Sequence, residues 1–184
     1  MIKKTVWDMG RPDVETFRKS PKIPVALVLD NVRSLNNIGS MFRTSDAFAV
    51  SEICLCGISA TPPSPEIHKT ALGAEDSVAW RYFPSTLEAL EALRAEGHVL
   101  CALELAHDSV SLERYKPEAG KKYAIVAGNE VDGVDEAVVA ACDVCLEIPQ
   151  LGTKHSLNVA ISAAVALWHF FEALSLRKDL GAQA

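Results

Sequence analysis

Short apolar runs alternate with amphipathic segments along most of the chain. We predict strands where aliphatic residues follow one another, and helices where apolar residues recur every three or four positions. The expected strands are 25–30, 53–58, 78–83, 99–103, 123–127 and 144–148, and the expected helices are 39–50, 65–72, 85–96, 134–141 and 156–174. This alternation predicts an α/β fold, with a mostly parallel sheet flanked by helices on both faces.

The composition is that of a globular protein. The chain has 184 residues, 49% hydrophobic and 23% charged, which suits one domain with a substantial core. Its longest apolar stretch, 159–171, is too short to span a bilayer, and the opening residues MIKKT do not resemble a signal peptide. We therefore expect a cytoplasmic protein with no membrane partner.

Charge is distributed unevenly along the chain. The formal net charge of −6 argues at first against a nucleic-acid partner. Residues 1–22, however, carry six Lys or Arg against three Asp or Glu, whereas residues 129–147 carry six acidic residues and no Lys or Arg. We expect 1–22 to be a basic N-terminal arm, either phosphate-binding or simply solvated, followed by a main domain over 23–176 and a tail over 177–184.

The cysteines allow two interpretations. Cys54 and Cys56 alternate in an expected strand, and Cys142 and Cys145 form a Cys-x-x-Cys pair. A four-cysteine zinc site is conceivable, but the spacings differ between the pairs, so we favour reduced packing thiols and expect no metal.

Three polar segments stand at expected strand-to-helix junctions, at 37–43, 128–133 and 148–159. Parallel strands end at the same edge of a sheet, and ligands bind in the crevice outside those ends. The three segments therefore predict one nucleotide-handling site.

The first segment places Asn37 at a helix entrance and Arg43 about one turn inside. Gly39, four residues before Arg43, is expected to leave space in front of the guanidinium, which is suited to binding a phosphate through two hydrogen bonds. The alternative is a surface arginine paired with Asp46.

The second segment, GNEVDG, follows an expected strand. Gly128 would let a ligand approach the backbone, and Gly133 would permit a tight exit into the next helix. Glu130 is available to a substrate or a cationic partner, although a purely structural turn is the alternative. The dinucleotide fingerprint has glycine at this position, so a standard NAD site is not expected.

The third segment, IPQLGTKHSLNV, opens the last expected helix. Ser156 is a plausible helix cap, which requires no function. Asn158 is harder to explain structurally, and the apolar stripe that follows it is expected to be core or a subunit interface.

Together these segments resemble the motifs of the SpoU/TrmH-type RNA 2′-O-ribose methyltransferases, part of the SPOUT group. Asn-x-Gly-x-x-x-Arg is matched at residues 37–43, Gly-x-Glu-x-x-Gly at 128–133, and Ile-Pro-x-x-Gly…Ser-Leu-Asn-Val at 148–159. The resemblance covers roughly residues 23–172. It implies an S-adenosylmethionine (AdoMet) cofactor, an RNA ribose 2′-hydroxyl acceptor, a C-terminal deep trefoil knot, and a homodimer with the active site at or near the interface.

The resemblance also implies roles for individual residues. The catalytic residues would be Arg43, Asn37, Glu130, Ser156 and Asn158; AdoMet would bind at Leu103, Gly128, Ile148, Gln150 and Leu157; RNA would contact Arg33, Lys154 and His155. A guanidinium scarcely deprotonates in a protein, so we expect Arg43 to bind the flanking phosphate and stabilise the developing alkoxide.

The resulting expectation is an AdoMet-dependent RNA ribose 2′-O-methyltransferase, with residues 23–176 as its catalytic domain. We expect tRNA as the substrate, with rRNA as the alternative. A non-catalytic RNA-binding or assembly module on the same fold is the alternative of a different class.

Overall fold

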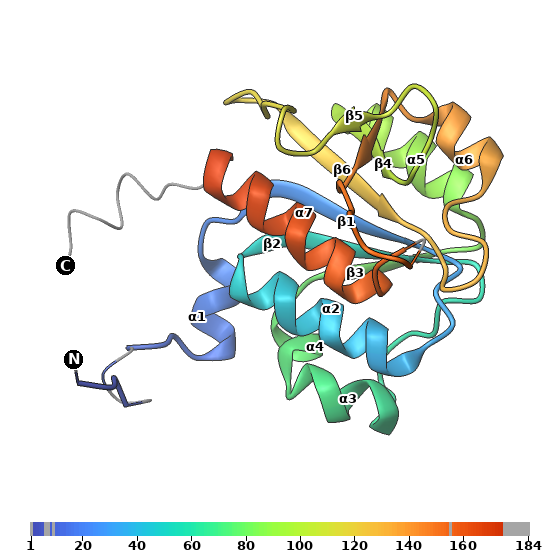
Figure 1. Cartoon of the computed structure of the whole chain (residues 1–184). Coiled ribbons are helices and arrows are strands. Elements are labelled where there is room, and N and C mark those ends of the chain that lie inside the picture. The colour runs from blue at the N-terminus through green and yellow to red at the C-terminus, as the bar shows by residue number, and fades with distance from the viewer. Residues whose placement is uncertain (1, 6–7, 9, 155, 175–184) are drawn as a thin grey trace.

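The computed structural model describes residues 2–5, 8, 10–154 and 156–174 (Figure 1). All strand pairs of its seven-stranded sheet are parallel, in the order β3-β2-β1-β6-β4-β7-β5. The strands are β1 (Ile23–Asp30), β2 (Val50–Cys56), β3 (Trp80–Phe83), β4 (His98–Leu103), β5 (Val110–Ser111), β6 (Lys122–Ala127) and β7 (Val144–Glu147).

Helices cover both faces of the sheet. They are α1 (Val14–Lys19), α2 (Leu35–Ala47), α3 (Pro65–Ala71), α4 (Ala74–Ser77), α5 (Thr86–Ala95), α6 (Glu136–Ala141) and α7 (Val159–Leu174). Helices α2, α3 and α7 share one hydrophobic core, and α5 and α6 share the other (Figure 1). Strand β1 serves both, because successive side chains of a strand point to opposite faces: Leu27 and Leu29 lie in the first core, Val28 in the second.

This architecture confirms the predicted parallel α/β fold. The trefoil knot and the division into arm, domain and tail stay predictions. Within the described residues, no helix is long and apolar enough to cross a membrane.

Capping side chains set the first residues of helices α5 and α2. The Ser85 hydroxyl accepts a hydrogen bond from the Glu88 backbone N–H and contacts Glu88 Oε1 at 2.9 Å, so the start of α5 is capped. Ser34 caps α2, which therefore begins at Leu35, four positions before the predicted start. Asn37 consequently lies inside the first turn of α2.

Three short elements escaped prediction: α1, α4 and β5. Each is too short to show a clear apolar period. Helix α1 lies within the expected basic arm and begins at the Asp13 cap.

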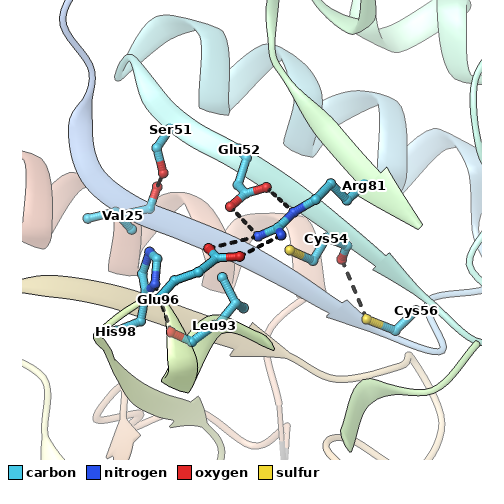
Figure 2. A network of polar contacts seen from close by, with 9 residues as sticks. All are labelled: Val25, Ser51, Glu52, Cys54, Cys56, Arg81, Leu93, Glu96 and His98. Carbon is cyan, nitrogen blue, oxygen red and sulfur yellow. Dashed lines mark hydrogen bonds and ion pairs between the residues drawn. The ribbon is translucent and has the colours of Figure 1, made fainter. Parts of the chain in front are cut away.

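A separate polar cluster joins β2, β3 and the end of α5 (Figure 2). Arg81 donates to both oxygens of Glu52, at 2.7 and 2.7 Å, and to both oxygens of Glu96, at 2.7 and 3.1 Å. Hydrogen bonds first from Glu96 and then from Glu52 raise the pKa of Arg81, and the guanidinium in turn lowers the pKa of Glu96. This cluster links β2, β3 and the end of α5 on the face of the sheet opposite α2.

Candidate active site

A cavity of about 290 Å³ lies at the carboxyl ends of β4, β6 and β7. Its walls come from the loop after β4, the whole second motif, and the segment between β7 and α7. The lining residues are Leu103, Glu104, Leu105, Ala127, Gly128, Asn129, Glu130, Val131, Asp132, Gly133, Ile148, Gln150, Ser156, Leu157, Val159 and Ser162.

The structure brings all five residues expected to bind AdoMet to this cavity. Leu103 ends β4, Gly128 follows β6, and Ile148 and Gln150 follow β7, while Leu157 precedes α7. Strand order explains this convergence, because β4 lies directly between β6 and β7. Glu130 and Ser156 also line the cavity, whereas Asn37, Arg43 and Asn158 do not.

Glu130 ties the second motif to the first. Its Oε1 accepts from the Asn37 side-chain amide at 2.8 Å and from the Ser34 N–H at 3.1 Å, and its Oε2 accepts from the Arg33 N–H at 3.1 Å. Burial disfavours the charged carboxylate, but these hydrogen bonds, led by that of Asn37, leave the pKa of Glu130 below its ordinary value. A negative charge beside the start of α2 is also favourable for the helix dipole.

Asn158 ties the third motif to the same network. Its Nδ2 donates to Asn37 Oδ1 at 3.1 Å, and its Oδ1 accepts from the Ala160 N–H at 2.9 Å. Asn158 is therefore the cap of α7, and the helix begins at Val159 rather than at Ser156. The prediction that Ser156 caps this helix is wrong. The Asn158 side chain, which the sequence left without a structural account, both caps α7 and contacts Asn37.

The glycines of the motifs make room for the chain itself. A Cβ on Gly39 would lie 2.1 Å from Thr70 Oγ1 and 2.3 Å from the Ile67 carbonyl oxygen. Gly39 therefore permits α3 to pack against α2, and the expectation that it leaves space for the Arg43 guanidinium is wrong. A Cβ on Gly128 would lie 2.0 Å from the Gly133 carbonyl carbon, so the second motif closes tightly on itself.

Arg43 is exposed on α2, and within the described part of the chain its guanidinium has no hydrogen bond or ion pair. Asp46, its expected surface partner, instead accepts a hydrogen bond from Ser77 at 2.5 Å. The ion-pair alternative for Arg43 is therefore wrong. An exposed guanidinium on α2, about 1.7 helical turns beyond Asn37, can reach an anionic substrate.

Two of the three residues expected to contact RNA lie in loops next to the motifs. Arg33 and Lys154 are exposed, and the Arg33 backbone also holds Glu130. His155 lies outside the described residues.

Sequence reasoning missed Glu104, which follows β4 and lines the cavity. Its Oε2 accepts from the Val134 N–H at 2.9 Å and its Oε1 from the Leu105 N–H at 2.8 Å. The feature that marks Glu104 as part of the site is its hydrogen bond with Val134 at the exit of the second motif. That contact depends on the pairing of β4 with β6.

The two cysteine pairs lie apart. Cys54 and Cys56 are buried in β2, and the strands β1, β6 and β4 separate β2 from β7 beside Cys142 and Cys145. Burial raises the pKa of the Cys56 and Cys142 thiols to about 12, so these groups are neutral packing thiols. The described residues hold no group of three or more His, Cys, Asp or Glu arranged to bind a metal ion.

The motifs, the sheet and the cavity together define a protein of the RNA methyltransferase class. The SpoU rRNA Methylase family model matches residues 24–168, and the chain belongs to that family. The chain is 29% identical over 176 residues to the 23S rRNA (guanosine-2′-O-)-methyltransferase RlmB of Vibrio cholerae, covering 95% of this chain and 68% of that protein. It is 32% identical over 164 residues to the tRNA (guanosine(18)-2′-O)-methyltransferase of Thermus thermophilus, covering 89% of this chain and 80% of that protein.

Solved structures agree with this assignment. The AdoMet-bound rRNA methyltransferase from Sinorhizobium meliloti superposes with a TM-score of 0.76 at 28% identity, over 85% of this chain. The match covers 59% of that protein, so this chain corresponds to somewhat more than half of its length.

Proposed function

We propose that this protein transfers a methyl group from AdoMet to a ribose 2′-hydroxyl of RNA. The observation that carries the proposal is the convergence of the three motifs, with five expected cofactor residues on one cavity and Glu130, Asn37 and Asn158 in one hydrogen-bonded chain. Residues 93 and 121 positions apart in sequence meet there.

The cavity fits AdoMet in its charge as well as in its position. Three carboxylates line it, those of Glu104, Glu130 and Asp132, and its described lining contains no Lys or Arg. AdoMet carries a sulfonium and an ammonium group against a single carboxylate, so its net charge is positive. Opposite charges attract strongly where water is partly excluded. Apolar residues such as Leu103, Ile148 and Leu157 would contact the adenosine part.

The residues of this chain act mainly by position. Bound in the cavity, AdoMet supplies an electrophilic methyl group that needs no further activation. Arg43 binds the phosphate next to the target ribose and stabilises negative charge on the 2′-oxygen as that oxygen bonds the methyl carbon. The proton passes to that phosphate or to water, and S-adenosylhomocysteine leaves. Asn37 and Asn158 hold the start of α2, and with it Arg43, relative to the cavity. Correct placement of two reactants can remove a large part of such a barrier.

The substrate of this chain belongs to the same proposal. We expect a tRNA, and the similarity to enzymes named for tRNA and for 23S rRNA keeps rRNA as the alternative. We also propose that the protein is a homodimer. Along α7, Ile161, Val165 and Trp168 are 54%, 39% and 43% exposed, an apolar face that a second copy would cover.

Nucleoside mass spectrometry of tRNA and rRNA, from cells with and without the gene, tests the reaction. The expected result is the loss of one 2′-O-methyl nucleoside, restored by the wild type and not by Arg43→Ala. The RNA pool that changes identifies the substrate class. An unchanged pair of pools, together with no AdoMet binding in calorimetry, would contradict the proposal and favour the non-catalytic module.

A further inference from the structure

Glu104 stands at the junction between the sheet and the cavity. Its backbone N–H donates to the Leu146 carbonyl oxygen at 3.0 Å, and its own carbonyl accepts from Cys145 Sγ at 3.4 Å. Both contacts are with β7, so the Glu104 backbone is fixed to the sheet just beyond the end of β4. Its side chain therefore extends from a rigid base.

The Glu104 carboxylate bridges two of the loops that form the cavity. One oxygen accepts the N–H of Leu105 in its own loop, and the other accepts the N–H of Val134 at the exit of the second motif. The Leu105 N–H lies just beyond the end of β4 and the Val134 N–H lies between the second motif and α6, so both are outside the strands. A carboxylate is a strong acceptor for two such donors at once.

The second motif has a shape that fits this carboxylate. Asn129 and Gly133 pair through two backbone hydrogen bonds of 2.9 and 3.2 Å, which close the loop into a tight turn. Gly133 has φ +73°, and a Cβ on it would lie 2.1 Å from Glu104 Oε2. The glycine thus serves both the turn and the close approach of the carboxylate.

We propose that Glu104 is a positioning residue of the cofactor cavity, acting through the second-motif loop. Its carboxylate holds Gly133 and Val134 against the loop after β4, so that the main-chain edges facing AdoMet are organised before the cofactor binds. The inference rests on the proposed function. It adds a residue outside the three motifs to the machinery of the reaction.

The variant Glu104→Gln tests this role with almost no change in size. An amide offers one oxygen acceptor, and its NH₂ group would face one of the two N–H donors. We expect the AdoMet Kd from calorimetry to rise about tenfold. The KM for AdoMet should rise in parallel, while kcat at saturating AdoMet stays within about twofold. The matched control is Glu113→Gln, on a fully exposed carboxylate that contacts Ser111, which should bind AdoMet as the wild type does.

A double-mutant cycle with Gly133 adds a readout of the direct contact. Gly133→Ala should weaken AdoMet binding through both its positive φ and the collision with Glu104. In a Glu104→Ala background the collision partner is absent, so the additional loss from Gly133→Ala should be several-fold smaller.

The outcomes separate the two proposals. Wild-type protein that binds AdoMet, with Glu104→Gln binding equally well or with additive effects in the cycle, would overturn the role of Glu104 alone. Wild-type protein that binds no AdoMet would overturn this role together with the proposed function. If Glu104→Gln does not fold, hydrogen exchange on the wild type decides. A Val134 amide exchanging as fast as an exposed loop amide contradicts the proposal, and a protected one supports it.

Discussion

Two polar networks in this protein use similar groups in opposite ways. At the Arg81 cluster, one guanidinium meets two carboxylates, and four hydrogen bonds satisfy nearly all of its donors (Figure 2). At the motif network, Glu130 accepts three hydrogen bonds, yet the Arg43 guanidinium, farther along α2, is exposed and has no hydrogen bond or ion pair within the described chain.

This contrast separates a structural arginine, Arg81, from Arg43, whose guanidinium can bind a ligand. A guanidinium whose N–H donors already form hydrogen bonds within the protein has few donors left for a substrate. Removing it lowers the free energy of unfolding. A guanidinium without partners contributes little to folding and keeps its donors for an incoming anion. Substitutions at Arg43 should therefore change turnover, whereas substitutions at Arg81 should change the free energy of unfolding.

The largest effect is expected at Arg43. Arg43→Ala should lower turnover at least about 100-fold, because it removes a donor set that stabilises developing negative charge. AdoMet affinity and the free energy of unfolding should stay close to wild type, since Arg43 lies outside the cavity lining. Single-turnover methylation and calorimetry measure the two. A large loss of AdoMet affinity would contradict the assigned role.

Asn158 should show a mixed effect, because it belongs to both structure and site. Asn158→Ala removes the α7 cap, which should cost about 1 kcal/mol of stability. It also removes the hydrogen bond to Asn37, which should lower turnover about tenfold or more. The matched variant Asn158→Asp keeps a capping oxygen but loses the donor to Asn37. It should recover stability without recovering turnover, as urea unfolding and methylation assays would show. Equal recovery of both would mean that the Asn37 contact does not matter.

Arg81 should show the reverse of Arg43. Arg81→Met keeps much of the side-chain volume but leaves Glu52 and Glu96 unpaired, and we expect a loss of about 1 kcal/mol in the free energy of unfolding. Methylation kinetics should be unchanged, because the cluster lies on β2, β3 and α5, away from the cavity. Reduced turnover in a folded Arg81→Met protein would contradict a purely structural role for the Arg81 cluster.

The smallest effect is expected in the pH dependence at Glu130. Its folded pKa lies below the ordinary 4.5, so its stabilising contribution is fully present above that value and disappears as the pH falls through the folded pKa. Glu130→Gln cannot titrate. The stability difference between wild type and variant should therefore shrink between about pH 6 and about pH 3 in unfolding experiments. A difference that stays constant over this range would contradict the lowered pKa.

Local patterns in the sequence predicted the longer elements and the class of chemistry. Runs of aliphatic residues marked every long strand, and the three motifs, through their resemblance to a known family, indicated a methyltransferase and predicted its cofactor residues. These signals are local, because side-chain periodicity and capping depend on neighbours within a few positions. Short elements such as α4 and β5 carried too few residues for a period to show.

Contacts between residues far apart in the chain became visible only in the folded molecule. Strand order separated the cysteine pairs and brought Glu104 to the exit of the second motif, and the packing of α7 beside α2 joined Asn158 to Asn37. It also showed that Gly39 accommodates a neighbouring helix rather than Arg43. Contacts of this kind depend on which strands pair and how the helices pack across them. No local pattern in the chain encodes that arrangement, because it arises from the burial of both faces of the sheet at once.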